Sequence, residues 1–229
     1  MIPFELVDIG KFFDAALAWE NLPFILEGLP MTIAVAFAGM AMGLILGFFL
    51  AIGRSSKFFF LRLPARFYIS FMRGTPILVF LFILYQGLPV VQIRLDAFTC
   101  AVLAFGLNSA AYIAEVNRGA LNSIAYGQWE SSYALGLNYW QTLTRVIVPQ
   151  AARVAMPPLT NVFLDLVKAT SLAAVITVPE MFQKAQIVAG RTFDSMTMYI
   201  TVALVYWPLC IIISYFQERL EKRFSRYIN

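Results

Sequence analysis

The chain has 229 residues, of which 60% are hydrophobic and only 13% are charged, so its composition is far from that of soluble globular proteins. It contains no histidine and only two cysteines, both in apolar runs, so the sequence lacks the usual parts of a metal site, a disulfide framework or a His-based nucleophilic enzyme. We expect a membrane protein, and membrane topology explains the net charge of +4 better than binding to nucleic acid does.

Residues 1–20 predict a short amphipathic helix that lies on the outer surface of the membrane. The stretch from Phe4 to Trp19 mixes charged and aromatic side chains, with Phe12, Phe13 and Trp19 as anchors for the interface. The segment lacks the basic start and the long apolar core of a cleaved signal peptide, which favours the interfacial helix.

Five stretches with few charges follow along the chain. A helix that rises 1.5 Å per residue needs about 20 residues to cross the hydrocarbon core of a bilayer. The sequence therefore predicts membrane spans at residues 28–53, 74–93, 97–114, 149–179 and 195–217, the fourth interrupted by Asp165 and Lys168. With no internal repeat and no long linker, we expect residues 1–229 to form a single all-α membrane domain.

The distribution of basic residues predicts the orientation of these spans. Segments 54–73, 118–153 and 219–226 hold 12 of the 17 Lys and Arg residues. Because Lys and Arg are enriched in cytoplasmic loops, we expect the N-terminus outside and the C-terminus in the cytoplasm.

The loop at residues 122–148 then lies in the cytoplasm, and it predicts two short helices. The first, around Tyr126 to Leu135, ends where Gly136 tolerates a left-handed cap. Asn138 with Gln141 three residues later resembles a capping box that starts the second helix, and Pro149 marks the entry into the fourth span.

Two interpretations of this loop remain open. It is either a solvated connector or a surface that docks into a groove of another protein. Ser131, Ser132 and Gly136 are small enough to let another backbone come close, while Trp129 and Tyr133 flank them with large faces.

The spacing within the loop carries a resemblance to a known family. Glu130, Ser131 and Ser132, then Gly136, then Val146 to Pro149 resemble the cytoplasmic "EAA…G…I-x-L-P" loop of permease subunits in ATP-binding-cassette importers. Two serines stand where the family usually has two alanines, which keeps the residues small. The resemblance implies a type I importer transmembrane domain whose loop seats in a cleft of a separate ATPase, with Glu130 making the polar contact and Pro149 passing the motion into the fourth span.

Four further segments resemble the polar amino acid uptake branch of that family. They are "RGTP" at 73–76, "AAYIAEVNRGAL" at 110–121, "PQAARVAMPPL" at 149–159 and "KATSLA" at 168–173, and the wider text, including "YGQWESS", looks closest to L-cystine permeases. The resemblance covers the chain from about Leu22 to Gln217. It implies transport of a polar amino acid across a bacterial cytoplasmic (inner) membrane.

The same resemblance implies a set of partners. They are two ATPase subunits, a second permease copy or a sister subunit, and an extracellular or periplasmic solute-binding protein. Because the chain has no G-x-x-x-x-G-K-[ST] motif, we expect it to be no enzyme itself, to hold no cofactor or metal, and to rely on a partner that binds ATP.

Asp165 and Lys168 need an explanation, because an isolated charge at the centre of a bilayer helix costs about 2.5 to 3.5 kcal/mol. Their separation of three places them on one helix face, where they can neutralise each other. Alternatively the pair, together with Thr170 and Ser171, borders a polar cavity in which a zwitterionic solute binds.

The family resemblance places substrates near the membrane midplane, among residues of the third and fourth spans. Asn108 and Tyr112 share one helix face and are expected to meet a solute opposite Lys168 and Thr170. Lys168 suits a carboxylate and Asp165 an ammonium group. Ala169 stands where the family often has aspartate, which disfavours a cationic substrate and favours a zwitterion such as cystine.

Two other classes of function stay open. In a stand-alone secondary transporter, Asp165 and Lys168 would form an ion-linked switch, but the five spans and the missing inverted repeat argue against this. In an intramembrane enzyme, Asp165 would be a catalytic acid, but the sequence offers no second carboxylate at similar depth.

Overall fold

The structure is a computed structural model that describes residues 12–225, and every regular element in that part of the chain is helical. The helices are α2 (Ala15–Leu26), α3 (Leu29–Ser55), α4 (Phe59–Gly74), α5 (Ile77–Phe82), α6 (Ala97–Asn122), α7 (Tyr126–Ala134), α8 (Tyr139–Thr142), α9 (Val148–Ala169), α10 (Met181–Thr192) and α11 (Ser195–Ser225). Shorter π and 3₁₀ turns are η1 (Ile83–Gly87), η2 (Leu88–Val91), η3 (Leu143–Ile147) and η4 (Thr170–Ile176).

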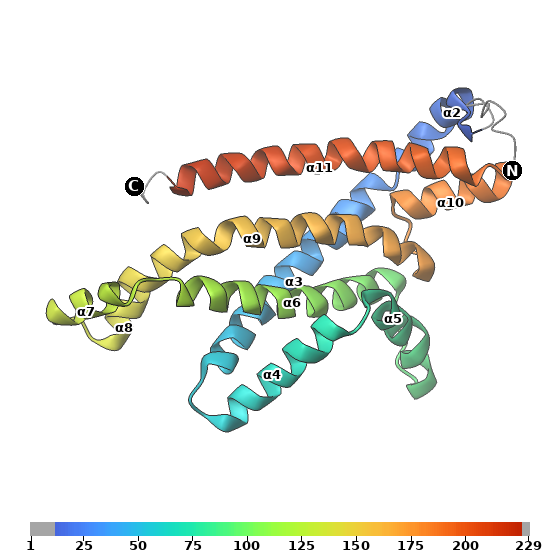
Figure 1. The fold of residues 1–229 in the computed structure, drawn as a ribbon. Helices are drawn as coiled ribbons and strands as arrows, with labels where there is room; N and C mark the ends of the chain where they lie inside the picture. The colour runs from blue at the N-terminus through green and yellow to red at the C-terminus, as the bar shows by residue number, and fades with distance from the viewer. Residues whose placement is uncertain (1–11, 226–229) are drawn as a thin grey trace, which may run out of the picture.

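The long helices run between two ends of the molecule (Figure 1). Helices α7 and α8 form one end, here called the α7 end, and α10 packs with α2 at the other, here called the α10 end. Helix α9 lies between α6 and α11 and packs on both, while α3 crosses them and packs along α6. Helices α6, α9 and α11 therefore run between the two ends, while α3 leads from the α10 end to α4.

Four helices in the described residues are long and apolar enough to cross a membrane: Leu29–Ser55, Ala97–Asn122, Tyr139–Ile176 and Ser195–Arg219. They confirm four of the five predicted spans. The fifth candidate is a bent pair, in which α4 meets the segment Ile77–Val91 at an angle of 103°.

The prediction of a second span at residues 74–93 is wrong in its bounds. Thr75 and Pro76 are extended, with ψ near 130°, so the helix stops after Gly74. The segment Ile77–Val91 that follows would reach only about 22 Å as a helix, which is too short to cross the bilayer alone. A fifth crossing by length therefore requires α4 and Ile77–Val91 together as one broken span, although the arginines of α4 had placed it in the cytoplasm.

Three glycines bring α3 and α6 into close contact. Gly39, Gly43 and Gly47 recur at every fourth residue and are all buried. A Cβ atom on Gly47 would lie 2.7 Å from Cγ2 of Ile113 on α6. Because association of helices in a bilayer depends on van der Waals packing, small residues at such spacing hold two spans together.

The described part of the N-terminal segment contains the start of helix α2. The predicted segment 1–20 falls mainly on residues 1–11, which lie outside the described residues. Asp14 is extended and its carboxylate accepts hydrogen bonds from the backbone N–H groups of Ala16 and Leu17. Helix α2 therefore begins at Ala15, and the interfacial helix expected over residues 1–20 stays a prediction.

A buried carboxylate organises the α10 end. Glu180 caps α10 by accepting hydrogen bonds from the backbone N–H groups of Phe182 and Gln183, at 2.9 and 2.6 Å, and it also accepts one from the hydroxyl of Tyr206 on α11 at 2.8 Å. The backbone N–H of Met181 donates to the hydroxyl of Thr32 on α3. Burial raises the pKa of Glu180 above its ordinary value, although the three hydrogen bonds oppose this.

Candidate functional site

The loop between α6 and α9 folds as the sequence predicts. Helix α7 spans Tyr126–Ala134, and Gly136 follows it with φ of +79°, a left-handed conformation that glycine adopts without strain. Asn138 and Gln141 form a complete capping box at the start of α8. The predicted two-helix loop is confirmed.

Fewer residues of this loop are exposed than the sequence predicts for a docking surface. Ser132 is buried, and its hydroxyl donates to the carbonyl oxygen of Gln128. Glu130 and Ser131 remain exposed. The ring of Trp129 stacks on Tyr139 at 5.8 Å, which fixes α7 against α8.

The loop is continuous with the following span. Residues Tyr139–Ile176 form one run of 38 helical residues, with Pro149 in the first turn of α9 and Pro157 and Pro158 inside it. The side-chain amide of Gln150 donates to the side-chain oxygen of Gln128, which ties the start of α9 to α7. The structure thus connects the exposed loop mechanically to the membrane helix.

The predicted charge pair on α9 forms, but on an exposed face. Nζ of Lys168 lies 2.8 Å from Oδ1 of Asp165, and the side chains are 58% and 76% exposed. The pairing predicted from their spacing is confirmed. Because charges facing lipid are costly, this face must meet water or another protein.

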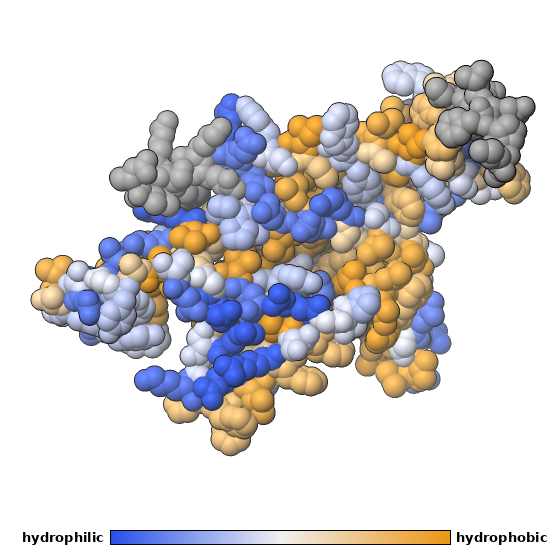
Figure 2. Space-filling view, viewed as in Figure 1, coloured by the Kyte–Doolittle hydropathy of each residue, from blue (hydrophilic) through white to orange (hydrophobic). Residues whose placement is uncertain are grey.

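Hydrophilic side chains also gather elsewhere along the long helices. Figure 2 shows hydrophilic side chains gathered over α4, α6 and α9 on one side of the molecule, bordered by hydrophobic ones around α5. On α4, Arg62, Arg66 and Arg73 lie at i, i+4 and i+11, which is one helix face. We call the side of the molecule on which hydrophilic side chains gather over these helices the polar face.

The two hydroxyls next to Lys168 bond to their own helix. Thr170 is fully buried, and its hydroxyl donates to the carbonyl oxygen of Val167 and lies 3.3 Å from the Tyr206 hydroxyl. The hydroxyl of Ser171 donates to the carbonyl oxygen of Lys168. Thr170 therefore does not reach the polar face.

The two predicted residues of α6 contact α4. The side-chain amide of Asn108 donates to the carbonyl oxygen of Met72 at 2.8 Å. The guanidinium of Arg73 lies over the ring of Tyr112, 5.5 Å from its centre. The structure brings Tyr112 to Arg73 and Asp165 to Lys168, and the described residues record no contact between these two groups.

Sequence reasoning missed a cluster of charges beside Tyr112. The carboxylate of Glu115 lies 2.9 Å from the guanidinium of Arg54, 3.1 Å from that of Arg118 and 3.8 Å from that of Arg73. The separation of three between Glu115 and Arg118 was a local signal for part of it. The contacts to α3 and α4 are long-range and left no pattern in the sequence.

A polar pocket of about 460 Å³ opens at this cluster. Its lining comes from Arg54, Ile69, Ser70, Arg73, Gly74 and Tyr112. It joins three helices, α3, α4 and α6, on the polar face. Charged groups that line such a pocket suit a polar ligand rather than lipid.

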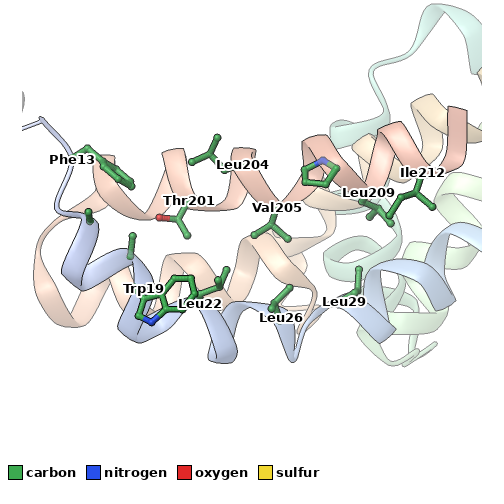
Figure 3. Close-up of a pocket in the computed structure, with 13 residues that line it drawn as sticks. Phe13, Trp19, Leu22, Leu26, Leu29, Thr201, Leu204, Val205, Leu209 and Ile212 are labelled. Carbon is green, nitrogen blue, oxygen red and sulfur yellow. The ribbon is translucent and has the colours of Figure 1, made fainter. Parts of the chain in front are cut away.

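A second, apolar groove of about 520 Å³ lies between α2 and α11 (Figure 3). Leu22 and Leu26 of α2 face Thr201 and Val205 of α11. Thr201 supplies the lining's one hydroxyl, which already donates to the carbonyl oxygen of Thr197. Besides this hydroxyl, the indole N–H of Trp19 is the only polar side-chain group in the groove's lining, so the polar face is the candidate site.

Comparison with known proteins identifies the fold and the family. The chain is 53% identical over 216 residues to the "Probable amino-acid ABC transporter permease protein YckA" of Bacillus subtilis, covering 94% of this chain and 96% of that protein. It is 42% identical over 219 residues to the "L-cystine transport system permease protein TcyB" of the same organism, covering 93% and 94%.

A solved structure agrees with this match. "Crystal structure of an amino acid ABC transporter with histidines" superposes with a TM-score of 0.84 at 32% identity, over 88% of this chain and 94% of that one. The predicted fold class, an all-α type I importer transmembrane domain, is confirmed. Residues 43–226 match the model of the family described as "Binding-protein-dependent transport system inner membrane component". The chain belongs to this family of membrane transport components.

Proposed function

We propose that this chain is the permease subunit of an ATP-driven importer for polar amino acids. The observation that carries the proposal is the presence of exposed or partly exposed charged side chains on α4, α6 and α9, helices that are otherwise apolar enough to span a membrane, together with the hydrophilic side chains that Figure 2 shows over them. A second permease copy or sister subunit covers this face and completes a polar path. The permease names of the two Bacillus subtilis relatives support the same function.

The proposed energy source is a pair of separate ATPase subunits. The exposed Glu130 and Ser131 on α7 dock into the ATPase, and the turn at Gly136 presents them. The continuous helix from Tyr139 through Pro149 carries the movement of the ATPase into the membrane. Alternating access follows from rocking of the two permease halves.

The proposed substrate is L-cystine. Lys168 suits a carboxylate and Asp165 an ammonium group, and their 2.8 Å pair stands exposed on α9. A zwitterion meets both charges without leaving either unpaired. The 42% identity to a protein named as an L-cystine permease supports this choice.

The proposed location is a bacterial cytoplasmic membrane, with the α7 end in the cytoplasm. The α10 end then faces outward, where a solute-binding protein delivers the amino acid. The Lys and Arg residues of segment 118–153, which includes α7 and α8, support this orientation.

ATP hydrolysis by the reconstituted complex tests this function. The permease, its ATPase and its binding protein are placed in liposomes, and each polar amino acid, with L-cystine first, is added in turn. Stimulation by one loaded binding protein supports both the import function and that substrate. If the ATPase does not associate at all, an ion-coupled secondary transporter becomes the better account, and gradient-driven uptake by the permease alone then tests it.

Reversal of the charge at Glu130 tests the docking surface. Glu130→Arg is expected to reduce co-purification of the ATPase at least about tenfold, because a buried polar contact becomes a like-charge or unpaired one. Glu20→Arg, which reverses an exposed acid on α2, is the control and leaves ATPase binding unchanged. Normal ATPase binding by the Glu130 variant would exclude the docking role.

A further inference from the structure

The pocket at Glu115 holds more positive than negative charge. Three guanidiniums, from Arg54, Arg73 and Arg118, surround one carboxylate. The ion pairs recorded among the described residues thus give the cluster a net charge of +2. Because unpaired charge is costly inside a membrane, an excess of positive charge there is stabilised by an anion or by water.

Arg73 is the cation that is held least tightly. Its distance to Glu115 is 3.8 Å, against 2.9 and 3.1 Å for Arg54 and Arg118. The side chain of Arg73 is 46% exposed, whereas that of Glu115 is only 17% exposed. Arg73 therefore gives up the weakest of the three contacts when another carboxylate arrives.

The surroundings of Arg73 form a pocket rather than a flat surface. The ring of Tyr112 lies under the guanidinium, and the pocket of about 460 Å³ has the hydroxyl-bearing Ser70 in its wall. A guanidinium that lies near an aromatic ring keeps N–H donors that can form two parallel hydrogen bonds to a carboxylate.

The pocket and the Asp165–Lys168 pair lie at different depths. Glu115 is seven residues, about 10 Å, from the end of α6 at the α7 end. Asp165 is 17 residues, about 26 Å, from the start of α9 at that same end. A solute that leaves the pair toward the α7 end would reach the Arg73 pocket next.

We propose that the Arg73 pocket is a carboxylate-binding site on the inner half of the transport path, in which the solute carboxylate replaces Glu115 at Arg73. This assignment of a second solute position rests on the proposed function. Competition with Glu115 keeps the binding weak, as transit requires, because a site on a path must release what it binds.

The test measures the preference of the pocket for anions in the full chain, assembled with its ATPase in liposomes without ATP. Ser70→Cys places a thiol in the pocket wall, Cys210→Ser removes the half-buried thiol, and Cys100 stays because it is fully buried. The probes are an anionic and a cationic methanethiosulfonate reagent, and the readout is the ratio of their labelling rates.

The chain with Ser70→Cys and Cys210→Ser is the parent for this test. We expect its thiol at position 70 to react faster with the anionic reagent than with the cationic one. Arg73→Gln should lower the rate ratio roughly tenfold, because one unit charge within about 6 Å of the thiol acts on both reagents with opposite sign. Arg73→Lys should keep the ratio. Arg62→Gln, which removes a charge about three turns from Arg73 on the same face of α4, is the matched control and should change the ratio less than about threefold.

Competition by a small carboxylate completes the test. Acetate should slow labelling of the parent more than chloride does at equal ionic strength, and it should have no such effect on Arg73→Gln. An equal ratio in the parent and Arg73→Gln, or equal effects of acetate and chloride, would reject the carboxylate site. Because neither readout needs ATP or the binding protein, that failure would leave amino-acid-stimulated ATP hydrolysis, and with it the proposed function, standing.

Discussion

At the scale of single residues, Glu180 is the most tightly surrounded acid among the described residues. It is fully buried, and its two oxygens serve two backbone N–H groups and one tyrosine hydroxyl. It joins the cap of α10 to α11 through Tyr206. A buried carboxylate in such a position makes the stability of the fold depend on pH.

Substitution Glu180→Gln should flatten that dependence. The raised pKa of Glu180 means that the folded chain binds this proton more tightly than the unfolded chain does. The contribution of Glu180 to the free energy of unfolding is therefore greatest below its ordinary pKa of 4.5. This contribution falls as the pH rises from 4.5 through the raised pKa. Glutamine carries no charge but has only one accepting oxygen. The substitution should therefore lower the free energy of unfolding by about 1 kcal/mol at low pH.

Thermal unfolding in detergent between about pH 4.5 and pH 8 checks this. The unfolding temperature of Glu180→Gln should lie about 2–4 °C below that of the parent at the acid end, with the gap narrowing as the pH rises. The control Glu20→Gln replaces an exposed acid and should show no such change. A gap that stays constant across the pH range would contradict the assignment.

Single-residue predictions succeeded where the interaction is local. The spacing of Asp165 and Lys168 is enough to predict their ion pair, because both lie in the same turn of α9. Thr170 was expected beside them, but the helix tightens to 3₁₀ geometry from this residue onward and turns its hydroxyl into the core. The contact of Tyr112 with Arg73 depends on how α4 packs, so no local pattern contained it.

At the scale of elements, α4 shows the limit of counting uncharged residues. Its face with Ala65, Ile69 and Met72 is buried, and its arginines lie together on another face. A hydropathy average over successive residues mixes these two faces, so it predicts a cytoplasmic loop where the structure has a helix. The loop at α7 and α8 was predictable because caps and left-handed glycines are local signals.

The α3–α6 contact leads to a prediction on element packing. Gly47→Ala should lower the stability of the fold by about 1–3 kcal/mol, because the added Cβ would lie 2.7 Å from the Cγ2 atom of Ile113 and 3.0 Å from the carbonyl oxygen of Ala110. The control is Gly119→Ala in α6, where no atom lies within 4 Å and alanine should be neutral or stabilising.

Temperature-dependent aggregation of the purified variants measures this difference. The Gly47 variant should lose its monodisperse elution peak at a lower temperature than the parent and the Gly119 variant. Equal midpoints for all three chains would mean that α3 and α6 separate at no cost, and the glycine contact would then not hold them together.

At the scale of the whole molecule, the two ends are predicted to lie on opposite sides of the membrane. Tyr126 at the start of α7 is 74% exposed, and Arg94 lies exposed in the loop before α6. In cells that express Cys100→Ser, Cys210→Ser chains, a membrane-impermeant maleimide should label Arg94→Cys directly. It should label Tyr126→Cys only after the membrane is opened. The reverse pattern would invert the proposed orientation.

The continuous helix from Tyr139 to Ile176 also has a mechanical consequence. At 1.5 Å per residue it is a lever of about 57 Å, so a tilt of about 10° at the α7 end would displace a stiff rod's far end by about 10 Å. Pro157 and Pro158 lie near its middle and cannot donate the backbone hydrogen bonds that stiffen a helix. The lever thus has a compliant joint between the half attached to α7 and the half bearing Asp165, so part of any stroke is absorbed as bending before it reaches the charge pair.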